Sequence, residues 1–158
     1  MRIVHVLIAS VVLAGRVLAQ EPHLAPNAPK DRPLGLDSVR WARLDSAIAP
    51  LVAQARLSYP AAKQRYLAGL PSGHTFFLTT RLRDNVGNLE QVFIAVDSIR
   101  GTRVFGRIWS DITVVQDYHH GESYSFAEAQ IIDWLISKPD GTEEGNLVGK
   151  FMDTYRPQ

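Results

Sequence analysis

Apolar residues recur at spacings of three and four along residues 39–55, which predicts an amphipathic helix at the start of the domain. The stripe consists of Val39, Trp41, Leu44, Ile48, Leu51, Val52 and Ala55. Asp37 or Ser38 can cap this helix, because a short side-chain oxygen accepts hydrogen bonds from the free N–H groups of a first turn. Pro50 has no N–H to donate, so we expect a kink or a restart there.

A second, short helix is predicted within the sequence AAKQRYLAGLPSG (61–73), after a break at Pro60. Its pattern turns Tyr66 and Leu67 toward the core. The helix is expected to end at Gly69, because glycine followed closely by proline and another glycine is typical of a helix C-terminus.

Three successive strands are predicted over 74–82, 90–99 and 103–115, because these segments are rich in aromatic and β-branched residues. The sequence NVGN (85–88) between the first two has the composition of a hairpin turn. In the second strand Val92, Ile94 and Val96 share one face. Gly106 marks a β-bulge or a close approach of the backbone in the third strand.

The segment 123–136 fits two structures. Ser125 and Glu128 have the spacing of a capping box, which favours a helix. The alternation of Ile132, Trp134 and Ile136 favours a strand.

The sequence EEGNLVGKFMDTY (143–155) predicts a short closing helix, because Leu147, Val148, Phe151, Met152 and Tyr155 have helical spacing. The predicted fold is therefore α+β, with N-terminal helices packed on a small antiparallel β-sheet and a short C-terminal helix. We assign it to a single domain over residues 37–158.

The first 19 residues resemble a secretory signal peptide. Arg2 precedes an apolar run from Ile3 to Ala14, and the small residues before position 20 suit cleavage after Ala19. The run is too short to span a bilayer, which takes about 20 residues. We therefore expect an exported bacterial protein, periplasmic or secreted, without stable membrane insertion after cleavage. Residues 20–36 carry four prolines and predict a flexible spacer.

The composition of the chain excludes several classes of function. The 158 residues are 46% apolar, which is enough for a packed core. Cleavage after position 19 removes two of the 17 basic residues and none of the 16 acidic ones, leaving 15 against 16. Such a near-neutral chain has no basic block suited to nucleic acid. The chain has no cysteine, which excludes disulfides, thiolate metal sites and a cysteine nucleophile. We predict no cofactor.

Five short motifs stand in the order found in the YegJ-like family, domain of unknown function 2314, which the chain resembles over about residues 47–150. The motifs are Ala55-Arg56, the acid-led strand from Glu90 to Val96, the glycine-containing strand from Gly106 to Trp109, the turn Gly121-Glu122, and the Ile-x-Asp-Trp strand from Ile131 to Trp134. The resemblance implies a small α+β domain and a strand over 131–136. It implies no reaction. The chain departs from the family at its end, where a helix replaces the usual glycine-rich turn and strand.

Adjacent histidines in QDYHHGESYSF (116–126) raise the question of a metal site. Neighbouring residues of an extended segment point to opposite sides, so His119 and His120 do not readily bind one ion. Ligands two apart on a strand would be His119 with Asp117, or His120 with Glu122. Because two ligands do not complete a site, we interpret the segment as a solvated polar turn.

Asp133 is the most conspicuous acid, since it lies among Ile131, Ile132, Trp134 and Leu135 and is expected to be partly buried. We interpret its role as structural, accepting backbone N–H groups from the turn at 138–141 or from a neighbouring strand. The alternative is a periplasmic hydrolase in which Asp133 pairs with Glu143 or Glu144 as acid and base.

Aromatic residues suggest a binding surface made of Trp109, Tyr118, Tyr124 and Phe126, with Trp134 as a further binding residue. Our first hypothesis is accordingly a non-catalytic module that binds an unknown protein, peptide or envelope component. The paired-carboxylate hydrolase is the second hypothesis, and a metal site at His119, His120 and Glu122 is the third.

Overall fold

The computed structural model describes residues 36–156, and these form two helices and six strands. In chain order the elements are α1 (Ser38–Ala68), β1 (Thr75–Arg83), β2 (Leu89–Arg100), β3 (Arg103–Ile108), β4 (Ser123–Ala127), a 3-10 turn (Glu128–Gln130), β5 (Asp133–Ser137), β6 (Glu143–Gly145) and α2 (Leu147–Thr154). The strands form one antiparallel sheet in the order β4-β3-β2-β1-β5-β6. The α+β prediction is confirmed. The predicted signal peptide, and the spacer up to residue 35, lie outside the described residues.

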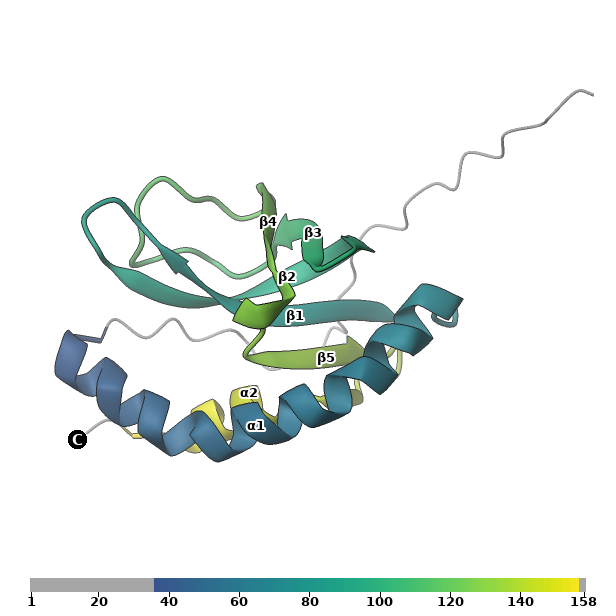
Figure 1. Ribbon diagram of the computed structural model, residues 1–158, viewed down its shortest axis with the longest axis horizontal. Coiled ribbons are helices and arrows are strands. Elements are labelled where there is room, and N and C mark those ends of the chain that lie inside the picture. Colours follow the sequence, from purple (N-terminus) through teal and green to yellow (C-terminus); the bar gives the residue numbers. More distant parts are fainter. Residues whose placement is uncertain (1–35, 157–158) are drawn as a thin grey trace, which may run out of the picture.

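Helix α1 is a single helix of 31 residues, so the predicted break into two helices is wrong. Its ends agree with the sequence, because Asp37 accepts a hydrogen bond from the Arg40 N–H at 2.8 Å and Gly69 follows the last turn. Pro50 and Pro60 both lie inside the helix. A proline costs about 3 kcal/mol there. Burial of Trp41, Leu44 and Ile48 before Pro50 offsets this cost, at about 1.5–3 kcal/mol apiece. Beyond Pro50 the helix buries the alanines Ala55 and Ala62, and it bows instead of ending (Figure 1).

The two halves of α1 pack against different parts of the molecule. The first half buries Trp41, Leu44 and Ile48 against Val148 of α2. The second half buries its inner alanines against the main core of the sheet, which includes Phe76, Leu78, Val92, Ile94, Val104, Ile108, Phe126, Trp134 and Ile136. The prediction that Val39 and Leu67 face the core is wrong, since each side chain is 59% exposed.

The other face of the sheet carries a separate apolar cluster. Phe77, Ala95 and Leu135 are buried there, with Phe93 and Trp109 partly buried against them. Adjacent residues of a strand point to opposite faces, which is why these side chains are out of phase with the main core.

The predicted hairpin is confirmed, with β1 and β2 paired in antiparallel register on either side of residues 84–88. β3 is shorter than predicted, because it ends at Ile108 instead of residue 115. Gly106 marks a close approach, since a Cβ at that position would lie 2.2 Å from the carbonyl oxygen of Ala95 on β2. The bulge in this pair of strands lies on β2, between Val96 and Ser98.

The ambiguous segment 123–136 contains both kinds of structure. Ser125 lies within β4, so the predicted capping box does not form, and the helical part is the single turn Glu128–Gln130. The strand prediction is confirmed for β5. The closing helix is confirmed as α2, preceded by the short strand β6. Within residues 36–156 neither helix combines the length and hydropathy that crossing a membrane requires.

Substituting Gly106→Ala tests the close approach between β2 and β3. The added methyl group would meet backbone atoms that cannot move aside, so we expect the free energy of unfolding to fall by about 3 kcal/mol. Gly101→Ala is the matched control, because nothing lies within 4 Å of the added carbon and only the positive φ of 58° is unfavourable. We expect that control to cost about 1–2 kcal/mol. Urea unfolding measures both, and equal losses would contradict the steric explanation.

Candidate functional site

Strand β4 forms one edge of the sheet, since no strand within residues 36–156 pairs with its outer side. The carbonyl of Glu122 accepts the N–H of Ile108 on β3 at 2.9 Å. Successive peptide groups of a strand point to opposite sides, so Tyr124, two residues further on, also directs its backbone groups to β3. The N–H and C=O groups of Ser123 and Ser125 therefore point away from the sheet.

The free edge is short. The next outward-pointing N–H group is that of Ala127, and it donates to the side-chain oxygen of Gln130 at 3.0 Å. The edge that remains open for pairing therefore spans Ser123–Ser125, and the 3-10 turn closes its far end.

Aromatic side chains line one side of this edge. The rings of Tyr118 and Tyr124 meet edge-on with centroids 6.0 Å apart, and Tyr124 stacks on Phe126 at 6.0 Å. Tyr118 and Tyr124 are partly exposed, whereas Phe126 is buried. Burial, followed by the neighbouring Tyr118, raises the pKa of the Tyr124 hydroxyl, which therefore stays neutral. The edge thus combines free backbone groups with two accessible phenol rings.

The loop between β3 and β4 is held in place by the buried carboxylate of Glu90, which is 1% exposed. One oxygen accepts the N–H and hydroxyl of Thr113 at 3.0 and 3.1 Å. The other accepts the N–H groups of Val114 at 2.9 Å and Val115 at 3.0 Å. Bonds to backbone N–H groups let an ionised carboxylate tolerate burial.

Asp84 continues this arrangement at the tip of the β1–β2 hairpin. It accepts the N–H groups of Val86 and Asn88 inside the hairpin, and that of Gln116 from the loop at 3.1 Å. The hydroxyl of Tyr118 donates to the carbonyl of Arg83 at 3.3 Å. These contacts position Tyr118 beside β4.

Sequence reasoning assigned no role to the Glu90 side chain or to Asp84. A signal for Glu90 was present, because it is in phase with Val92 and Ile94 on the inward face of β2. An acid at an apolar position of a strand predicts a buried carboxylate that needs donors. The donors themselves follow no local pattern.

The histidine segment forms a turn before β4. Gly121 adopts a positive φ of 81°, and its N–H donates to the carbonyl of Ile108 at 2.7 Å. Glu122 accepts the N–H of His119 at 3.0 Å, while the ring of His120 lies 5.3 Å from that of Trp109. Among the described residues, no group of three or more histidine or acidic side chains is placed to hold a metal ion.

Asp133 has a structural position. It is fully buried, and its two oxygens accept the N–H of Trp134 at 2.8 Å and that of Val148 at 2.6 Å. Burial raises the pKa of this carboxyl, against the effect of these donors and of Gly149 and Lys150. The donors differ from those expected, since Val148 belongs to the first turn of α2 and not to residues 138–141. Asp133 therefore caps α2, whose own N-cap residue makes no side-chain cap.

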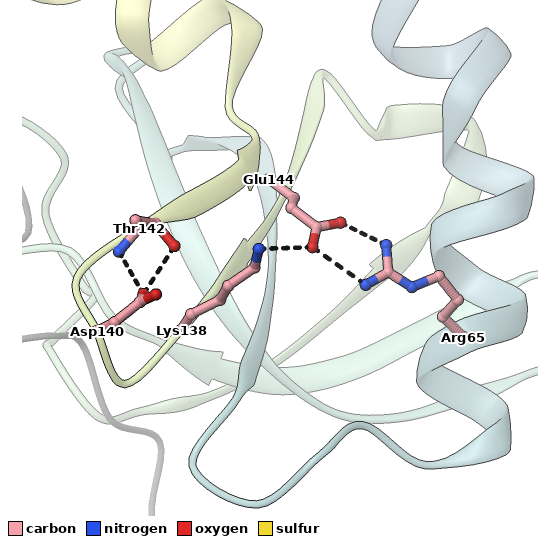
Figure 2. Close-up of polar contacts among 5 residues, drawn as sticks. All are labelled: Arg65, Lys138, Asp140, Thr142 and Glu144. Carbon is pink, nitrogen blue, oxygen red and sulfur yellow. Dashed lines mark hydrogen bonds and ion pairs between the residues drawn. The ribbon is translucent and has the colours of Figure 1, made fainter.

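The other two acids of the hydrolase hypothesis are also engaged. Figure 2 shows Glu144 between Arg65 of α1, at 2.5 Å, and Lys138, at 2.9 Å. Hydrogen bonds from Arg65 and then Lys138 lower the pKa of Glu144 to about 2. Glu143 accepts from the side chain of Asn146 at 2.8 Å. Neighbouring strand residues point apart, so Glu143 and Glu144 do not converge.

The predicted aromatic surface divides into three parts. Tyr118 and Tyr124 stay together beside β4, where they pack partly buried against the core in which Phe126 is fully buried. Trp109 lies on the opposite face, with its ring 6.1 Å from that of Phe77. Trp134 is 9% exposed and donates its indole N–H to Ser58 at 2.9 Å, so its assignment as a binding residue is not supported.

Comparison with known proteins adds no relative, since no family model, no curated protein and no solved structure matches the chain. The candidate site therefore depends on the geometry of β4 and its loop.

Replacing Glu90 by Gln should release the loop. Glutamine has one acceptor oxygen, and its NH₂ group faces N–H donors, so at least one pair of bonds is lost. We expect a loss of about 2–4 kcal/mol in the free energy of unfolding, and faster amide hydrogen exchange at residues 113–115. Exchange in β5, which Glu90 does not contact, serves as the internal control. Unchanged exchange at 113–115 would show that Glu90 does not hold the loop.

Glu144→Gln tests the contact in Figure 2 through its pH dependence. The folded pKa of Glu144 lies below the ordinary value of 4.5, so its contribution to stability is complete above about pH 4.5 and is lost as the pH falls toward 2. The side chain is 32% exposed, so the contribution is less than about 1 kcal/mol. The variant should be less stable at pH 7 and equal to the natural chain near pH 2. Glu143→Gln is the control, and a difference that persists at pH 2 would contradict the assignment.

Proposed function

We propose that the chain is an exported, non-catalytic binding module of the bacterial cell envelope that captures an extended segment of a partner protein or peptide at β4. The observation that carries the proposal is the open edge at Ser123–Ser125, where backbone donors and acceptors point outward. An extended peptide can add to such an edge as a further strand, using main-chain hydrogen bonds for affinity.

The composition of β4 supports this role. Natural sheets usually protect an edge with a charged residue or a proline. The sequence of β4, SYSFA, contains neither. Tyr118 and Tyr124 beside it provide rings against which apolar side chains of an added strand can pack.

The acids of the alternative hypothesis support binding over hydrolysis. Asp133 caps α2, Glu143 binds Asn146, and Glu144 binds Arg65 and Lys138. Each has a structural partner, and no observation favours their use as an acid and base pair. Export rests on the signal-like pattern of residues 1–19.

A proline substitution at the edge tests the proposal. Peptides are selected from a displayed random library on residues 20–158, and the affinities of those recovered are measured for Ser125→Pro and Ser125→Ala. Proline removes the outward N–H and leaves the bonds to β3, so we expect about tenfold weaker binding, the value of one lost hydrogen bond. Alanine keeps the N–H and should bind like serine.

Thermal unfolding checks that both variants fold, and an edge position with an outward N–H accommodates proline. The proposal fails if no peptide is recovered, or if peptides bind Ser125→Pro and Ser125→Ala equally.

A further inference from the structure

A row of arginines stands directly behind the open edge. Arg103 and Arg107 on β3 are exposed and lie opposite Ala127 and Ser123 on β4 in the sheet register. Residues paired in this way project from the same face of the sheet. Phe105 lies between the two arginines and is paired with Ser125.

The side chains of β4 on this face are small, so they do not screen the arginines from an added strand. Arg103 already reaches β4, because its guanidinium donates to the hydroxyl of Ser125 at 3.1 Å. A strand added to β4 would lie about 9.6 Å from β3, which is two strand spacings. An arginine side chain that extends over a serine of β4 can meet a carboxylate side chain that extends from the added strand, so the two can form an ion pair across this distance.

The local charge is predominantly positive. Arg100 is also exposed on this side, with its guanidinium 5.4 Å from the ring centre of Phe105. The acid nearest to the row is Asp97, which lies 3.9 Å from Arg107. The two side chains are about half exposed, and such surface pairs are weak enough for a competing carboxylate to replace them.

We propose that β4 selects extended segments that carry acidic side chains two residues apart on one face. This inference rests on the proposed function and names the chemistry of the partner. The spacing follows from the open edge Ser123–Ser125, since Arg107 lies opposite Ser123 and the guanidinium of Arg103 reaches the hydroxyl of Ser125. The residue between the two acids points to the other face, the face of Tyr124, and should be apolar. The predicted pattern is acidic–apolar–acidic.

Designed peptides test the pattern directly. Labelled peptides containing Ser-Glu-Val-Glu-Ser, Ser-Gln-Val-Gln-Ser or Ser-Lys-Val-Lys-Ser are titrated with residues 20–158, and fluorescence anisotropy is measured. Two exposed charge pairs predict binding of the glutamate peptide about fivefold tighter than that of the glutamine peptide. The lysine peptide should bind weakest, and added salt should reduce the differences.

A charge-reversed variant tests whether the two arginines determine the preference for acidic peptides. In the double variant Arg103→Glu with Arg107→Glu, the order of peptide affinities should invert, so that the lysine peptide binds tighter than the glutamate peptide. The matched control is Arg40→Glu with Arg156→Glu, which changes the net charge equally at exposed positions on α1 and after α2. It should keep the original order.

The outcomes separate this inference from the proposed function. If the glutamate peptide does not bind, or binds no tighter than the glutamine peptide, or if the control inverts the order as well, the charge pattern is wrong. Library peptides that bind the natural chain and lose affinity in Ser125→Pro would then still support strand addition at β4. If those peptides ignore Ser125→Pro, the proposed function fails whatever charges they carry.

Discussion

The placement of β4 depends on a buried carboxylate. Glu90 occupies an inward position of β2 and takes three backbone N–H groups and one hydroxyl from residues 113–115. An ionised group at this depth is unstable without such donors. The requirement draws the loop out of the β-ladder after β3 and returns the chain to β3 as the edge strand β4. The open edge follows from that return, and β4 lies beside the arginines of β3 because of it.

Hydrogen bonds between carboxylates and donors from other segments also join the helices to the sheet. Asp133 on β5 caps the first turn of α2 at Val148, so one carboxylate links the sheet to the C-terminal helix. On α1, Arg56 donates to the carbonyls of Ala129 and Ile131, which gives the Ala-Arg step of the sequence a structural purpose. Tyr59 and Lys63, one and two turns further along α1, both donate to Glu128 at 2.6 Å. Polar side chains thus fix where α1 contacts residues 128–131, while the stability of the packing between helix and sheet comes mainly from apolar burial.

The interior and the edge use charge differently. Buried acids are matched to backbone donors and determine the path of the chain. The arginines of β3 are exposed and have one weak acidic partner, so their charge is available to a partner molecule. This contrast is the reason for placing the binding role at the edge of the sheet and not at the conspicuous acid Asp133.

The sequence by itself determined the elements whose signals are local. The start of α1 at Asp37, its end at Gly69, the hairpin at 85–88 and the closing helix each depend on residues within a few positions of one another. Periodicity also identified the inward face of β2. It could not decide whether α1 passes through Pro50, because burial on both sides of the proline comes from distant residues.

Only the tertiary structure decided the partners of the buried acids, the separation of the aromatic residues between two faces, and the position of β4 at the edge. The sheet order puts β5 beside β1 and leaves β4 outermost, although β4 and β5 are adjacent in the sequence. Strand order and hydrogen-bond donors are settled by which distant segments can pack together at once. A local pattern shows that a residue needs a partner, and the closed fold determines which partner it has.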